Sequence, residues 1–198
     1  AEAPLLGVWF ENASHGLAVG AFGLVFETRD GGLSWSRRSL TEQSDEEAHL
    51  NALFPGENGS LFVAAERGSL FRSRDAGATW QRLALPYEGS FWGGLALGNG
   101  SLMTFGMRGN VFRSSDQGET WQRLEPLTDQ SLQNATRLSN GRVVVVGLGG
   151  VILGSDDAGQ SFTAMIQSDR KGLAAVAEGR PGEAIFFGEA GISRRTTR

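Results

Sequence analysis

The chain has 198 residues, 40% hydrophobic and 20% charged, which is ordinary for a globular domain with a sizeable core. Its formal net charge of −4 disfavours a general nucleic-acid binder, and no run of about 18 apolar residues that could cross a membrane is present. Cysteine is absent, which excludes disulfides, thiolate metal sites and cysteine nucleophiles.

Short apolar or β-branched segments follow one another along the chain, with turn residues between them and no helical periodicity. The first eight predicted strands cover residues 5–11, 16–21, 24–28, 35–40, 49–54, 61–65, 69–73 and 80–85. The next eight cover residues 91–97, 102–106, 110–114, 121–127, 132–138, 142–147, 151–155 and 162–166. The last three cover residues 173–177, 184–188 and 191–196. The sequence therefore predicts an all-β protein.

One motif recurs four times between these segments, with the pattern Ser/Thr-x-Asp-x-Gly-x-Ser/Thr-aromatic. Its aspartates, spaced 45, 41 and 41 residues apart, are Asp30, Asp75, Asp116 and Asp157. Its glycines are Gly32, Gly77, Gly118 and Gly159. Its aromatic residues are Trp35, Trp80, Trp121 and Phe162. Because these residue types keep a fixed register, the sequence indicates a repeat protein.

Each copy of the motif is expected to form a hairpin turn. The aspartate can accept backbone N–H bonds, the glycine can take a positive φ, and the aromatic residue opens the next strand and packs between sheets. We expect the four aspartates to be structural. Metal binding is the alternative, although the spacing of a calcium-binding loop is absent.

The motif resembles the Asp-box, or bacterial neuraminidase repeat. This resemblance implies a β-propeller of four-stranded antiparallel blades, with the box between the third and fourth strands and far from the ligand face. A glycine also recurs at a regular spacing after the second strand of each group. These glycines are Gly23, Gly68, Gly109, Gly150 and Gly191. A single domain over residues 1–198 would hold full blades at about 5–40, 49–85, 91–127 and 132–168, and a partial fifth at 172–198.

The fifth group lacks a fourth strand, and residues 1–4 are too few to supply one. We expect the C-terminal part of a longer, seven-bladed propeller. A five-bladed ring and an assembly completed by a second copy are the alternatives. Open strand edges would allow self-association. The start Ala-Glu-Ala-Pro fits either a mature end after signal-peptide removal or a cloning boundary, and we expect a periplasmic or secreted protein.

Enzyme chemistry of the sialidase type needs three arginines, a tyrosine paired with a glutamate, and an aspartate. The single tyrosine, Tyr87, has Glu88 beside it, but adjacent side chains tend to point apart, and the Arg-Ile-Pro signature is absent. His15 and His49 lie outside any ligand-spaced cluster and are expected in turns or at the surface. We expect no enzyme activity, no metal and no cofactor.

Two regions supply candidate partner-binding residues. Tight turns after the second strands carry Glu66-Arg67, Met107-Arg108, Leu148-Gly149 and Glu189-Ala190, and residues 86–94 bring aromatic side chains between two blades. We select Glu66, Arg67, Tyr87, Glu88 and Arg108. The acidic residues 41–48 are expected to form an exposed loop, either simply solvated or partner-binding.

Nearly the whole chain resembles the photosystem II stability/assembly factor-related family of Asp-box propellers, closest to its bacterial, non-photosynthetic branch. The four boxes, residues 18–26, residues 87–91 and residues 147–151 carry the resemblance. It implies a seven-bladed, non-enzymatic periplasmic scaffold. In the photosynthetic branch such proteins help to assemble a membrane complex, and bacterial relatives are thought to accompany exporters of the resistance–nodulation–division type.

We therefore predict an interaction scaffold for an envelope membrane-protein complex or exporter, with a protein partner and no nucleic acid. The alternative is a carbohydrate-binding or sialidase-like glycoside hydrolase propeller.

Overall fold

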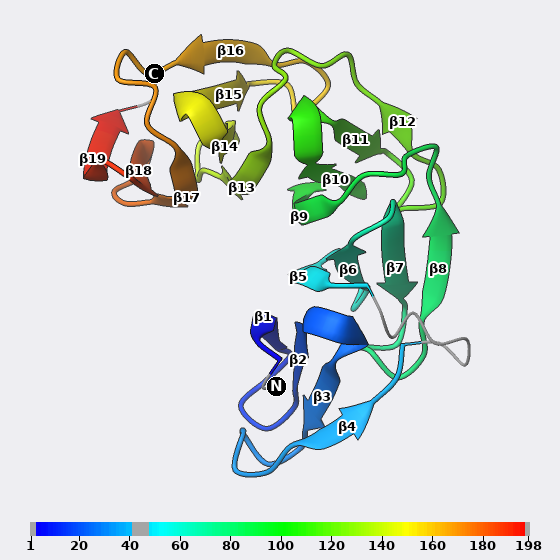
Figure 1. The fold of residues 1–198 in the computed structure, drawn as a ribbon. Coiled ribbons are helices and arrows are strands. Elements are labelled where there is room, and N and C mark those ends of the chain that lie inside the picture. The colour runs from blue at the N-terminus through cyan, green and yellow to red at the C-terminus, as the bar shows by residue number, and fades with distance from the viewer. Residues whose placement is uncertain (1–2, 41–47, 197–198) are drawn as a thin grey trace. The chain divides into compact units, whose positions relative to one another are not determined.

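The computed structural model describes residues 3–40 and 48–196 and is drawn in Figure 1. The chain divides into two compact units, Ala1–Phe91 and Trp92–Arg198. The described residues form four four-stranded sheets and one three-stranded sheet, each with its strands in chain order from one edge to the other. These sheets confirm the predicted all-β class and the blade architecture of four full blades and a partial fifth.

The first unit contains the first two blades, coloured blue to green in Figure 1. The first blade consists of β1 (Leu5–Phe10), β2 (Gly16–Gly20), β3 (Val25–Thr28) and β4 (Ser36–Arg38). The second blade consists of β5 (Leu50–Pro55), β6 (Leu61–Ala65), β7 (Ser69–Ser73) and β8 (Gln81–Ala84).

The second unit contains the remaining three blades, the first of which starts at the unit boundary. The third blade consists of β9 (Phe91–Gly98), β10 (Ser101–Gly106), β11 (Val111–Ser114) and β12 (Gln122–Arg123). The fourth consists of β13 (Leu132–Arg137), β14 (Val143–Gly147), β15 (Val151–Ser155) and β16 (Thr163–Ile166). The fifth consists of β17 (Leu173–Glu178), β18 (Glu183–Gly188) and β19 (Gly191–Thr196).

The core of each unit lies between neighbouring sheets. β6 and β14, the second strands of their blades, are buried along their full length. This burial explains why their sequences are unbroken apolar runs. In the first unit, Val19 and Val25 pack with Val63 and Phe71 of the next blade. In the second unit, similar clusters join the third blade to the fourth and the fourth to the fifth. Neighbouring blades within a unit therefore share a cluster of buried side chains between their sheets.

In the first, second, fourth and fifth blades the first strand carries a register shift near its start. The shift lies between Leu5 and Gly7 in β1, and it recurs at the matching places in β5, β13 and β17. A bulge re-aims one side chain and increases the local twist of the strand. In the first and second blades the residues so displaced are Leu6 and Asn51.

The outer strands are shorter than the sequence predicts. Each begins one residue after the aromatic residue of the Asp-box, so the prediction that this residue opens the strand is wrong. The largest difference is in the third blade, where β12 has two residues instead of the expected seven. Pro126 has no N–H group to donate to the sheet, which explains why pairing does not extend there.

The expected exposed loop at residues 41–48 falls almost entirely outside the described residues. Its last member, Ala48, is buried, with 3% of its surface exposed, so the expectation is wrong at that position. The backbone explains the burial, because the Ala48 carbonyl accepts a hydrogen bond from Gly23 N at 2.9 Å.

Candidate functional site

The turns between the second and third strands share one geometry in the first four blades. Two consecutive residues have positive φ, and the next N–H donates back to the carbonyl three residues earlier, as in a type I′ hairpin turn. The residue pairs with positive φ are Phe22-Gly23, Arg67-Gly68, Arg108-Gly109 and Gly149-Gly150. The second position is always glycine, which accounts for the glycine register seen in the sequence.

In the first unit, the turn at Glu66 and Arg67 is locked against the segment that leaves the second blade. Gly68 N donates to the Gly89 carbonyl at 2.7 Å, and a Cβ atom on Gly68 would overlap the Tyr87 carbonyl oxygen. The fit therefore needs glycine for space as well as for its φ of +65°. Arg67 and Glu88 are exposed, while Glu66 and Tyr87 are half-buried.

Tyr87 is held by its own segment. Its hydroxyl donates to the Ser90 carbonyl at 3.3 Å, and its ring lies 4.8 Å from that of Phe91, which is fully buried. The ring thus anchors the segment, and the neighbouring residue Glu88 is exposed. The structure brings together four of the five selected residues; Arg108 lies in the other unit, at the tip of the equivalent turn.

Two neighbours of these residues, Phe22 and His49, are not among the five partner-binding candidates selected from the sequence. Phe22 occupies in the first blade the turn position that Arg67 occupies in the second, and 55% of its surface is exposed. Its N–H group donates to His49 Nδ1 at 3.3 Å, and the two rings are 4.9 Å apart and steeply inclined. The register that Gly23 shares with Gly68 in the sequence places Phe22 at the turn position of Arg67.

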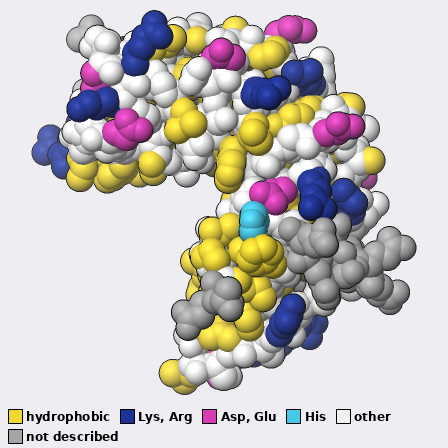
Figure 2. Space-filling view, in the orientation of Figure 1, with side chains coloured by type: hydrophobic (Ala, Val, Ile, Leu, Met, Phe, Trp, Pro, Cys, Tyr) yellow, Lys and Arg dark blue, Asp and Glu magenta, His cyan; other side chains and the backbone are white. Residues whose placement is uncertain are grey.

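His49 also connects the two turns. Its N–H donates to Glu66 Oε2 at 3.0 Å, and its carbonyl accepts from Glu66 N at 3.1 Å. Figure 2 shows hydrophobic side chains next to a histidine and to acidic and basic side chains on the visible face of the first unit. We call the six residues Phe22, His49, Glu66, Arg67, Tyr87 and Glu88 the turn surface.

The Asp-box carboxylates accept hydrogen bonds within their own turns. Asp30 Oδ1 accepts from the Ser34 N–H at 2.9 Å and from the Thr28 hydroxyl at 2.8 Å, and Oδ2 accepts from the Ser34 hydroxyl at 2.6 Å. The same three bonds recur in the other boxes. These bonds, first the Ser34 hydroxyl, lower the pKa of Asp30 to about 2. Those from Ser161 and Ser155 lower the pKa of Asp157 to about 2 as well.

His15 is more enclosed than a surface histidine, with 14% of its side chain exposed. Its Nδ1 lies 2.9 Å from Glu11 Oε2, and its Nε2 lies 3.0 Å from Oε1 of the buried Glu27. Arg29 and Arg38 also pair with Glu27. This cluster ties the β1–β2 turn to β3, because two cations and a histidine surround one buried carboxylate.

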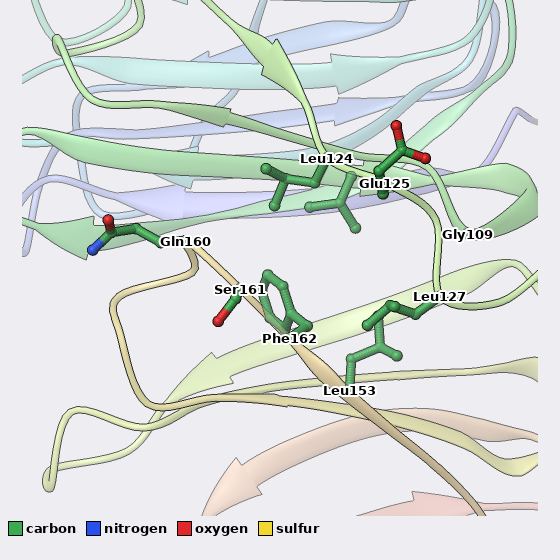
Figure 3. A pocket seen from close by; sticks show the side chains of 9 residues that line it. Gly109, Leu124, Glu125, Leu127, Leu153, Gln160, Ser161 and Phe162 are labelled. Atoms are coloured by element: carbon green, nitrogen blue, oxygen red, sulfur yellow. The ribbon is translucent and has the colours of Figure 1, made fainter.

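The second unit has a pocket of about 300 Å³ between the outer part of the third blade and the Asp-box of the fourth. The residues that follow the end of β12 take part in its lining. Leu127, Leu153 and Phe162 turn toward one another, and the Glu125 carboxylate turns away (Figure 3). The lining is mainly apolar.

Within residues 3–40 and 48–196, no group of three or more histidine, aspartate and glutamate side chains is arranged to hold a metal ion. The same part of the chain contains no helix that is long and apolar enough to cross a membrane.

Comparison with known proteins identifies the family. A family model described as "Photosynthesis system II assembly factor YCF48" matches residues 1–162. A curated relative, "Photosystem II assembly lipoprotein Ycf48" of Synechococcus, is 35% identical over 85 residues, which are 42% of this chain and 25% of the relative. The chain thus matches about a quarter of that relative's length.

Two solved structures share the fold. One, titled "YCF48 bound to D1 peptide", has a TM-score of 0.76 and 25% identity over 97% of this chain and 63% of its own. The other, YCF48 from Cyanidioschyzon merolae, has a TM-score of 0.77 and 21% identity over 100% of this chain and 68% of its own.

Proposed function

Because this chain belongs to the photosynthesis system II assembly factor YCF48 family, we propose that it is a non-enzymatic scaffold that binds a segment of a membrane protein. The family match confirms the resemblance seen in the sequence. The matched relatives are named as assembly factors, which supports a role without catalysis. A solved relative is bound to a peptide, according to its title, which supports a peptide-like segment as the occupant.

The observation that carries this proposal is the locked geometry of the turn surface. The hydrogen bond from Gly68 N to Gly89 O fixes the backbone of the Glu66–Arg67 turn on the Tyr87 segment, so binding would cost little further ordering of that backbone. Arg67 offers a forked donor for carboxylate or carbonyl groups, and Glu88 offers an acceptor. We assign Arg108 the same role on its own unit.

The finer parts of the proposal concern location and partner. We place the protein in the periplasm and its partner in an envelope complex or exporter; the lipoprotein name of the curated relative supports an envelope location. We also propose that its blades form part of a larger propeller, since the chain spans less than two thirds of the first solved relative. Without further blades beside them, open strand edges and exposed apolar residues such as Val8 and Ile192 favour self-association of the chain.

The test is affinity capture from detergent-solubilised envelope membranes, using the longest native form of the protein. We expect one membrane protein to be recovered, and expect Arg67→Glu and Arg108→Glu to reduce its recovery. Arg123→Glu, on the exposed outer strand β12, is the matched control and should recover it fully. Equal recovery by all three variants would argue against the proposed surface. Specific binding on a glycan array would favour the carbohydrate-binding alternative.

A further inference from the structure

Phe22 combines an unfavourable backbone conformation with an exposed aromatic ring. Its φ of 54° and ψ of 43° lie in the left-handed region, which bulky residues rarely occupy, and type I′ turns favour asparagine or glycine there. The fourth blade has Gly149 at the matching position. With 55% of the residue exposed, burial of the ring does not explain why phenylalanine is placed at this tip. Strained residues of this kind occur preferentially at binding sites.

The surroundings of the ring define what it could bind. His49 Nδ1 accepts the Phe22 N–H, so the proton of a neutral imidazole is on Nε2, where it can be donated. The His49 ring packs against that of Phe22 in an inclined geometry, which fixes one side of an aromatic contact site. An incoming aromatic or aliphatic group would contact the exposed part of the Phe22 ring.

A cation stands at the matching tip of the next blade. Arg67 has a φ of 55° and is exposed, and Glu66 beside it directs Oε2 back to the N–H of His49. The Glu66 carboxylate is therefore engaged on the protein side, and Arg67 occupies the exposed tip of the turn. The first unit thus presents an aromatic ring in contact with an imidazole, and His49 in turn is hydrogen-bonded to the turn whose tip is Arg67.

We propose that Phe22, His49 and Arg67 form a subsite for a peptide segment in which an aromatic side chain adjoins a carboxylate. The Phe22 ring takes the aromatic group, and Arg67 pairs with the carboxylate. This inference rests on the proposed scaffold function and deepens it, because it specifies the chemistry of the segment. It also explains why both tips retain a side chain at a position that glycine would occupy without strain.

The probe is N-acetyl-phenylalanine, followed by amide chemical shifts in NMR titrations of the full chain. N-acetyl-phenylalaninamide, which lacks the carboxylate, is the matched ligand. We expect the acid to shift amides near residues 22, 49 and 67, and to bind more tightly than the amide. Phe22→Gly should weaken binding of the acid about two- to tenfold, the worth of one aromatic contact. Arg67→Gly should remove the preference for the acid over the amide.

Ala76→Gly is the control for strain relief, because Ala76 has a φ of 53° in an Asp-box turn away from the turn surface. It should leave probe binding unchanged. Unchanged binding in Phe22→Gly, or equal binding of acid and amide, would overturn the subsite.

Capture of the membrane protein separates the subsite proposal from the scaffold proposal. If Phe22→Gly captures the membrane protein fully while Arg67→Glu does not, the scaffold stands and the subsite fails. If the unmodified protein captures no partner but the titrations succeed, the scaffold function fails and the subsite stands.

Discussion

Arg113 on β11 donates a hydrogen bond from Nε to the carbonyl of Ala158, 3.1 Å away in the Asp-box of the next blade. A second bond, from Nη2 to the Ser101 hydroxyl at 3.1 Å, holds the guanidinium in place. The half-buried arginine thus joins the third blade to the turn of the fourth inside one compact unit.

Replacing Arg113 with alanine should lower the free energy of unfolding by about 1–3 kcal/mol, since it removes charge-assisted bonds and leaves the Ala158 carbonyl without this donor. The urea midpoint is the measurement. Arg123→Ala, on the exposed strand β12, is the control. It should change the free energy of unfolding by less than about 0.5 kcal/mol and so leave the urea midpoint nearly unchanged. Equal midpoints for the two variants would show that the contact does not stabilise the fold.

Gly68→Ala should destabilise the first unit far more than Gly59→Ala. Both glycines have positive φ, so both substitutions incur left-handed strain of about 1–2 kcal/mol. Only at Gly68 would the new methyl group meet the Tyr87 carbonyl, whereas nothing lies within 4 Å of a Cβ on Gly59. The overlap should add about 1–3 kcal/mol, measured by urea unfolding. Similar losses at both sites would mean that the turn does not pack on the Tyr87 segment.

Phe22→Gly should leave the protein as stable as before or stabilise it by up to about 1 kcal/mol, because glycine relieves the left-handed strain while adding flexibility to the unfolded chain. Thermal unfolding measures the change in stability. Ala76→Gly is the control, because it relieves left-handed strain at a position that carries no aromatic ring. A marked loss of stability in Phe22→Gly would indicate that the ring is needed for packing against His49.

Acid should weaken the Asp-boxes in a defined range. The pKa of Asp30 falls from 3.8 to about 2 on folding, so its contribution to stability is complete above about pH 4 and is lost as the pH falls toward 2. Asp30→Asn should therefore flatten the pH dependence of the urea midpoint between pH 4 and 2. Asp129→Asn, an exposed residue outside the boxes, is the control. An unchanged slope in Asp30→Asn would contradict the hydrogen-bonded carboxylate.

The repeat made the blades predictable, because a motif that fixes the turn also fixes the strands on both sides. The strands at residues 61–65, 69–73, 151–155 and 191–196 have the predicted bounds. The short β12 was harder to predict, since its end depends on where a single proline falls relative to the sheet edge.

The turn surface was only partly predictable. Glu66, Arg67, Tyr87 and Glu88 were found from charge and aromatic content, but Phe22 was not, because residue preferences argue against a phenylalanine with positive φ. Its position follows from the backbone register set by Gly23. The contact of Phe22 with His49 depends on how two neighbouring blades pack, which local sequence does not specify.

The most direct test of the scaffold is site-specific photo-crosslinking in native membranes. A photoreactive amino acid replaces Arg67 in one form of the protein and Arg123 in another, and crosslinked partners are identified by mass spectrometry. The account predicts that one membrane protein crosslinks at position 67 and not at position 123. Crosslinking of that protein at position 123 alone, or equally at both positions, would contradict the assignment of the turn surface as the binding site.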